Sequence, residues 1–104
     1  MAMTFDEYQE FARSTAIYPE EYRVVYPTLG LCGEAGEVAE KIKKHMRDGR
    51  TLVGVGLELG DVLWYVSALA DDLGVTLEEI AQANMSKLSS RMERNKITGD
   101  GDNR

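Results

Sequence analysis

The stretch from residue 56 to residue 73 is the most apolar part of this 104-residue chain, and it restricts the folds open to it. Its apolar side chains follow helical spacing on more than one stripe, whereas a small helical domain buries one face of each helix. A helix of this kind needs a second partner beyond its own chain. We therefore expect a homodimer or a larger assembly with this helix near the interface.

Capping boxes and helix breakers predict the remaining elements. Thr4 with Glu7, and Thr76 with Glu79, have the spacing of helix N-caps. No segment alternates with period two for long enough to predict a strand, and Leu52–Val55 is the one weak candidate. The predicted class is therefore all-α. We expect a single domain over 1–104 with helices at about 4–16, 26–46, 56–73 and 76–94, a Gly-rich stretch over 49–56 and a polar tail over 95–104.

Composition excludes several classes of function. The formal charge of −6 and the pI of about 4.7 argue against a protein that binds nucleic acid by neutralising phosphates. One cysteine, Cys32, and one histidine, His45, exclude an internal disulfide and a Cys/His zinc site. No apolar run reaches the roughly 20 residues of a membrane span, and the N-terminus lacks the pattern of a signal peptide. We expect a soluble, cytoplasmic domain.

Acidic residues at helical spacing are the first candidates for chemistry. Glu34 and Glu37 stand three apart, so both carboxylates leave one face of the second predicted helix. A solvated charged face is the alternative, because Glu37 and Glu40 each have a lysine four residues later, Lys41 and Lys44. Glu34 has no such partner.

A second acidic pair, Glu58 and Asp61, interrupts the most apolar helix. No Lys, Arg or His occurs between Arg50 and Lys87, so these two carboxylates lack a local cation. Unpaired charge beside an apolar core costs several kcal/mol, and a shared metal ion removes that cost. Carboxylates on two facing helices form a hard oxygen site that suits Mg²⁺ or Mn²⁺. The predicted metal ligands are Glu34, Glu37, Glu58 and Asp61.

Glycines surround the first acidic pair. Gly33 and Gly36 lie inside a predicted helix, where each costs about 1 kcal/mol relative to alanine. Close approach of another helix or of a ligand would explain them.

A basic face follows on the fourth predicted helix. Asn84, Lys87 and Arg91 are separated by three and four residues and share one face beside an apolar stripe. Cations next to a metal-binding acidic site suit a polyphosphate. The alternative is a set of surface bases that the helix dipole favours near a C-terminus.

These motifs together resemble the MazG-like family of all-α nucleoside triphosphate pyrophosphohydrolases. The similarity lies in Glu-x-x-Glu at 34–37, Glu-x-x-Asp at 58–61 and Asn-x-x-Lys-Leu-x-x-Arg at 84–91, in the right order over nearly the whole chain. The ending at 101–104 is similar to that of the short single-domain branch. The resemblance implies a four-helix unit that forms dimers or tetramers.

The resemblance also implies an activity, the hydrolysis of a (deoxy)nucleoside triphosphate between its α- and β-phosphates to a monophosphate and pyrophosphate. The four acids would bind Mg²⁺, and a spare carboxylate, Glu37 or more weakly Glu40, would act as general base. Substrate contacts would come from Asn84, Lys87 and Arg91. Apart from the resemblance, Arg104 in the polar tail is a further candidate for a contact with the nucleotide, or for a contact across a dimer. Tyr26, Trp64 and Tyr65 are candidates for stacking on the base, although aromatic residues at helical spacing more often belong to a core.

One departure and two alternatives accompany this interpretation. Some family members place a lysine just before the second acidic pair, where this chain has Gly54, and Arg50 or the tail would have to replace it. The enzyme could instead act on a narrower substrate, such as dUTP, phosphoribosyl-ATP or an alarmone. The fold could also serve as a non-catalytic helical interaction module.

Overall fold

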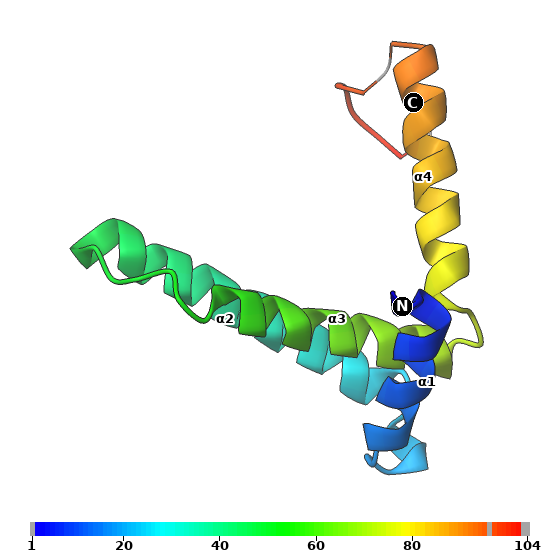
Figure 1. The fold of residues 1–104 in the computed structure, drawn as a ribbon, viewed down its shortest axis with the longest axis horizontal. Helices are drawn as coiled ribbons and strands as arrows, with labels where there is room; N and C mark the ends of the chain where they lie inside the picture. The colour runs from blue at the N-terminus through cyan, green and yellow to red at the C-terminus, as the bar shows by residue number, and fades with distance from the viewer. Residues whose placement is uncertain (1, 96, 103–104) are drawn as a thin grey trace.

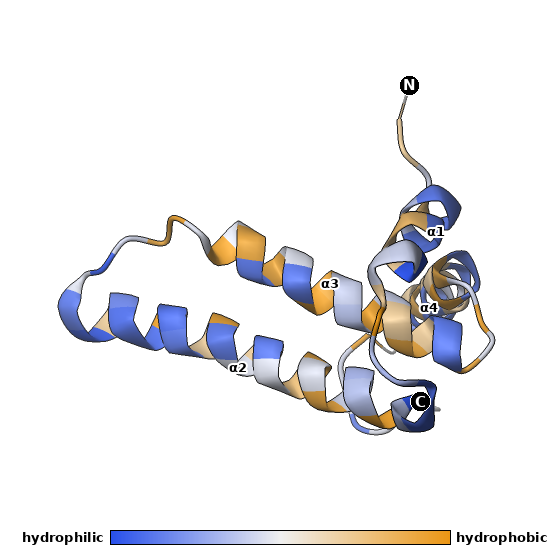
Figure 2. Ribbon diagram, turned by 90° about the horizontal axis from the view of Figure 1, so that it is seen from below, coloured by the Kyte–Doolittle hydropathy of each residue, from blue (hydrophilic) through white to orange (hydrophobic). Residues whose placement is uncertain are grey.

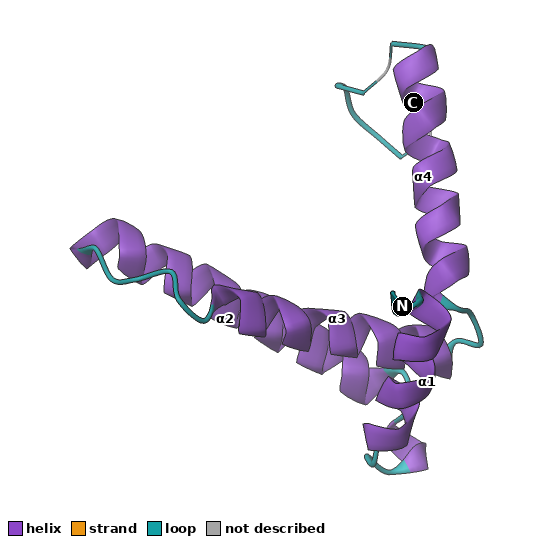
Figure 3. Ribbon diagram, in the orientation of Figure 1, coloured by secondary structure: helices purple, strands orange, loops and turns teal. Residues whose placement is uncertain are grey.

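All regular secondary structure is helical in the part of the chain that the computed structural model describes, residues 2–95 and 97–102 (Figure 3). The four predicted helices are confirmed, and each end lies within two residues of its expected position. Leu52–Val55, the weak strand candidate, is a loop and turn that runs into a helix, which agrees with the all-α prediction. The elements are α1 (Phe5–Thr15), the 3₁₀ helix η1 (Glu20–Tyr22), α2 (Val25–Asp48), α3 (Val55–Asp72) and α4 (Leu77–Glu93).

Both predicted capping boxes place their threonine at a helix start. The Thr4 hydroxyl accepts a hydrogen bond from the Glu7 amide at 3.1 Å, and the Glu7 carboxylate accepts one from the Thr4 amide at 3.1 Å. Thr76 accepts from the Glu79 amide at 3.0 Å. These bonds satisfy amides that the first helical turn leaves without a partner, which fixes where α1 and α4 begin.

The long helices α2 and α3 form an antiparallel hairpin (Figure 1). Helix α1 packs at the C-terminal end of α3, and α4 leaves from that end at a steep angle to the hairpin. Gln9 holds the start of α4, since its buried amide donates to the Val75 carbonyl at 3.1 Å and accepts from the Leu77 amide at 3.0 Å.

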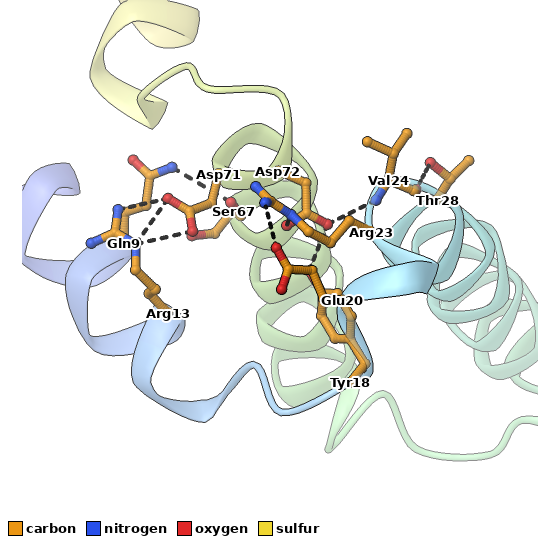
Figure 4. Close-up of polar contacts among 10 residues, drawn as sticks. All are labelled: Gln9, Arg13, Tyr18, Glu20, Arg23, Val24, Thr28, Ser67, Asp71 and Asp72. Carbon is orange, nitrogen blue, oxygen red and sulfur yellow. Dashed lines mark hydrogen bonds and ion pairs between the residues drawn. The ribbon is translucent and has the colours of Figure 1, made fainter.

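Two aspartates at the end of α3 tie this helix to the chain before α2 (Figure 4). Asp71 pairs with Arg13 at 2.6 Å. Asp72, with only 8% of its side chain exposed, accepts from the Tyr18 hydroxyl and the Val24 amide, each at 2.8 Å. Burial alone would raise the pKa of Asp72, but the Val24 amide, Tyr18 and Arg23 outweigh it and lower the pKa. The bond to Val24 holds a residue with a φ of 68°, which a β-branched side chain rarely adopts.

Replacing Asp72 with alanine should destabilise the protein by about 2 kcal/mol, because it removes a buried acceptor from several donors at once. Asp71→Ala is the matched control. It removes an ion pair with Arg13, whose side chain is 56% exposed, and this loss should cost less than about 1 kcal/mol. Urea unfolding of both variants measures the difference. Equal losses would show that the contacts of Asp72 do not hold the turn at Val24.

The single chain buries few large side chains. Its buried apolar residues are mostly alanines, Ala12, Ala68 and Ala70, together with Leu77. Apolar positions on α3 remain open to solvent, with Leu57 79% and Leu59 55% exposed, and orange positions recur along this helix in Figure 2. The radius of gyration is 16.5 Å, whereas a compact domain of about 100 residues has about 13 Å. In the described ranges no helix is both long and apolar enough to cross a membrane.

Candidate metal and nucleotide site

Three of the four predicted metal ligands come together on the α2–α3 hairpin. Glu34 projects from α2, while Glu58 and Asp61 project from one face of α3 because they stand three residues apart. Each offers a carboxylate oxygen, and these oxygens lie within 4.8 Å of one another. We call Glu34, Glu58 and Asp61 the acidic cluster. A group of this size and chemistry fits a divalent ion that prefers oxygen ligands.

Gly30 allows α2 and α3 to approach each other closely, whereas Gly33 and Gly36 do not lie against another helix. A Cβ atom on Gly30 would lie 2.1 Å from the Tyr65 ring, so only glycine fits against α3 there. Around Gly33 and Gly36, no described atom comes within 4 Å of such a Cβ atom. The close approach of another helix is therefore made at Gly30, while Gly33 and Gly36 leave the surface beside Glu34 open. For these two glycines the approach of a ligand stays a prediction.

A lysine from the neighbouring helix reaches the acidic cluster. The Lys41 ammonium lies 4.0 Å from a Glu58 carboxylate oxygen. Glu58 lacks a cation nearby in the sequence, as stated above, but the inference that its charge is unpaired was wrong, because Lys41 reaches it from across the hairpin. Lys41 also comes within 3.9 Å of a Cβ atom built on Gly54. It thus brings a positive charge to the position where the resemblance led us to expect one.

Charge repulsion remains inside the cluster. Burial, followed by the charges of Asp61 and Glu58, raises the pKa of Glu34. The folded chain therefore binds a proton at Glu34 more tightly than the unfolded chain does. Stability from this group is present at low pH and is lost as the pH rises through the raised pKa. The ionised cluster costs folding free energy, which a bound cation would offset.

Glu34→Gln should therefore raise the melting temperature of the metal-free protein at neutral pH. The gain should shrink as the pH falls from about 7.5 to about 4.5, because wild-type Glu34 then becomes protonated. Glu40→Gln is a control of opposite sign, since lysines lower the pKa of Glu40. Thermal unfolding in EDTA gives all three curves. A lower melting temperature for Glu34→Gln at neutral pH would mean that the cluster is not repulsive.

The two candidates for the general base differ in their surroundings. Glu40 pairs with Lys43 at 3.1 Å and with Lys44 at 3.8 Å, so the predicted Glu40–Lys44 pair is present. Lys43, the stronger influence, and Lys44 lower the pKa of Glu40, which makes its carboxylate a weaker base. Glu37 is exposed on α2 and is outside the acidic cluster as the structure defines it.

The predicted phosphate ligands lie on α4, which points away from the hairpin (Figure 1). Asn84 is exposed there, and Arg91 is buried, with 6% of its side chain exposed. Lys87 and Arg91 both pair with Asp102, at 2.7 Å and 3.2 Å. Arg104, the last predicted substrate ligand, lies outside the described residues.

Aromatic side chains continue the site beyond the acidic cluster. A cavity of about 370 Å³ is lined by Glu34 and Asp61 together with Thr15, Trp64 and Tyr65. The last three residues also line a second cavity of about 310 Å³, whose wall includes Tyr18 and Tyr26. The rings of Tyr18 and Tyr26 are stacked with their centroids 4.8 Å apart. Two carboxylates and the half-buried side chains of Trp64 and Tyr65 therefore border the same cavity.

Comparison with known proteins agrees with this geometry. The family described as MazG nucleotide pyrophosphohydrolase domain matches residues 27–95, which span the acidic cluster and the basic face of α4. The chain belongs to this family. This MazG domain is also 45% identical to the Gene 37 protein of Mycobacterium phage L5 over 114 aligned residues, which cover 98% of this chain and 100% of that protein. No solved structure matches it.

Two contacts of the MazG domain could not have been found by sequence motif. Lys41 meets Glu58 from another helix, and Asp102 meets Lys87 from the tail. Neither Lys41 nor Asp102 stands at a motif spacing from its partner, so only the folded structure shows that these charged residues pair.

Proposed function

We propose that this MazG domain hydrolyses (deoxy)nucleoside triphosphates between the α- and β-phosphates in a reaction that depends on Mg²⁺. The products would be a nucleoside monophosphate and pyrophosphate. The supporting observation is the acidic cluster, three carboxylate oxygens within 4.8 Å on two helices of a chain that belongs to this family. Nucleotide pyrophosphohydrolysis makes the domain a hydrolase of phosphoric anhydrides.

The residues present fit a hard divalent cation. Glu34, Glu58 and Asp61 would hold Mg²⁺, or Mn²⁺ in its place, and Glu37 is proposed as a further ligand. A bound cation of this kind screens phosphate charge and lowers the pKa of a coordinated water. Glu37 is also the better candidate to accept the proton of the attacking water, because Glu40 is held by two lysines.

The aromatic cavity next to the cluster would receive the base. Trp64 and Tyr65 border both cavities, and the Trp64 indole donates to Thr15 at 2.7 Å, which fixes the orientation of its ring. A flat base bound beside these rings would gain stacking energy, and its phosphates would then extend toward Glu34 and Asp61. Stacking of this kind accepts different bases, because every base has a face that stacks.

The cations for the phosphates would come from two places. Lys41 already lies beside Glu58, and it is proposed to move toward a phosphate when a metal ion replaces it. Lys87, Arg91 and Asn84 are proposed to act on the acidic cluster of a second copy, because α4 diverges from the hairpin of its own chain (Figure 1). A homodimer or homotetramer would also cover the exposed leucines of α3 and Met85 and Met92 of α4, which are 64% and 69% exposed.

Pyrophosphate release from the eight common NTPs and dNTPs, with Mg²⁺ and with EDTA, tests the substrate class. Turnover of several of them only with Mg²⁺ is expected. Turnover of one alone would indicate a narrower enzyme. Failure of all eight, even after dUTP, phosphoribosyl-ATP and an alarmone are added to the panel, would contradict the proposal and favour a non-catalytic module.

A further inference from the structure

The C-terminal tail loops out from the end of α4 and folds back to this helix (Figure 1). Its last described residue, Asp102, contacts the basic face of α4. A carboxylate oxygen of Asp102 lies 2.7 Å from the Lys87 ammonium and 3.2 Å from the Arg91 guanidinium. The same guanidinium nitrogen of Arg91 also donates to the main-chain carbonyl of Asp102. One residue of the tail therefore contacts both of the predicted phosphate ligands.

The surroundings of Arg91 favour the binding of an anion. Its side chain is only 6% exposed, and its Nε atom is buried without a hydrogen-bond partner among the described residues. A buried guanidinium that keeps a spare donor is costly unless an anion lies against it. Lys87 stands one helical turn away on the same face, so the two cations can share one anionic group.

A carboxylate satisfies these donors in the same way as a phosphate oxygen does, since both are anionic acceptors. Asp102 stays ionised in this position, because Lys87 first and then Arg91 lower its pKa. The side chain of Asp102 is itself 77% exposed, so water can reach it and the tail can leave without opening a core.

We propose that Asp102 occupies the phosphate position on Lys87 and Arg91 when no substrate is bound, and that a triphosphate must displace the tail to reach them. This inference rests on the proposed function, which gives Lys87 and Arg91 their role as phosphate ligands. It adds that Asp102 competes with the phosphates for these two cations. The apparent dissociation constant for a polyphosphate would then equal the intrinsic constant divided by the fraction of molecules in which the tail is open.

Asp102→Ala and Asp100→Ala in the full chain test the inference. Both variants remove one negative charge from the tail, but Asp100 makes no ion pair with Lys87 or Arg91 in the described structure. The probe is inorganic tripolyphosphate, and its binding is followed by calorimetry in EDTA at low ionic strength, where the metal site is empty. We expect Asp102→Ala to bind about three- to tenfold more tightly than Asp100→Ala.

Lys87→Ala combined with Asp102→Ala should remove this gain, since the freed cation is then missing. Equal binding by the Asp102→Ala and Asp100→Ala variants would overturn the inference, and so would failure of both to bind tripolyphosphate. Pyrophosphate release is measured separately on each protein. If the enzyme is active but both variants bind tripolyphosphate equally, only the proposed role of the tail is contradicted. If Asp102→Ala binds tripolyphosphate more tightly but the protein releases no pyrophosphate, only the proposed function is contradicted.

Discussion

Asp61→Asn should lower the rate of Mg²⁺-dependent pyrophosphate release by about a hundredfold or more. Asp61 lies in the acidic cluster with Glu34 and Glu58, and it lines the cavity that continues to the aromatic rings. Asparagine keeps the shape of the side chain and removes its charge, so a loss of activity can be assigned to a lost anionic ligand. The same change should stabilise the metal-free protein, because one of three repelling charges is gone.

The rate is measured with saturating nucleotide over a range of Mg²⁺ concentrations, and metal affinity with Mn²⁺ by electron paramagnetic resonance. Glu21→Gln serves as the matched control, since it removes a carboxylate from the exposed η1 helix and should change neither quantity. Turnover by Asp61→Asn at the wild-type rate would remove Asp61 from the metal site.

Lys87→Ala should weaken binding of a non-hydrolysable triphosphate by roughly tenfold to a hundredfold, because a charge-assisted hydrogen bond to phosphate is lost. The affinity for Mn²⁺ in the absence of nucleotide should stay nearly the same, since Lys87 is on α4 and not in the acidic cluster. Arg47→Ala, which removes an exposed cation near the end of α2, is the control. Loss of Mn²⁺ binding in Lys87→Ala would contradict its phosphate role.

Mixing the Asp61→Asn and Lys87→Ala variants should restore activity, if each site combines two copies, at a nucleotide concentration too low for either variant alone to turn over well. In a mixed assembly, the Lys87→Ala chain can supply an intact acidic cluster and the Asp61→Asn chain can supply an intact Lys87, so a site formed by these two chains is complete. Random exchange of subunits forms such sites with a probability of about one quarter, so about a quarter of the wild-type rate is expected. The mixture is unfolded, refolded and assayed beside each variant alone. Activity no higher than the average of the two parents would show that each site uses its own α4.

The helices could be predicted because their signals are local. Thr4 and Thr76 are each followed by a glutamate three residues later, and both threonines accept a hydrogen bond from that glutamate's amide at the start of α1 and of α4. The reciprocal bond that completes a capping box is present for Thr4 and Glu7. The acidic cluster could also be predicted, because Glu58 and Asp61 have helical spacing on an apolar helix, and the facing helix brings Glu34.

Contacts between distant residues could not be predicted. Asp72 looks like an ordinary acid at a helix end, but the turn at Val24 closes against it from 48 residues earlier in the chain. The start of α4 is held by hydrogen bonds from the buried amide of Gln9 in α1, and no sequence signal indicates these bonds. Asn84, Lys87 and Arg91 lie on one helix, α4, as predicted, but the divergence of α4 from the acidic cluster of the same chain (Figure 1) was not predicted.

The central claim is that this MazG domain cleaves between the α- and β-phosphates of a nucleotide. Chromatography of the nucleotide products from a single dNTP, combined with ³¹P NMR of the released phosphate, tests it directly. We expect the monophosphate and pyrophosphate in Mg²⁺, and no products in EDTA. A diphosphate and orthophosphate would contradict the claim, because the cleaved bond would then lie between the β- and γ-phosphates.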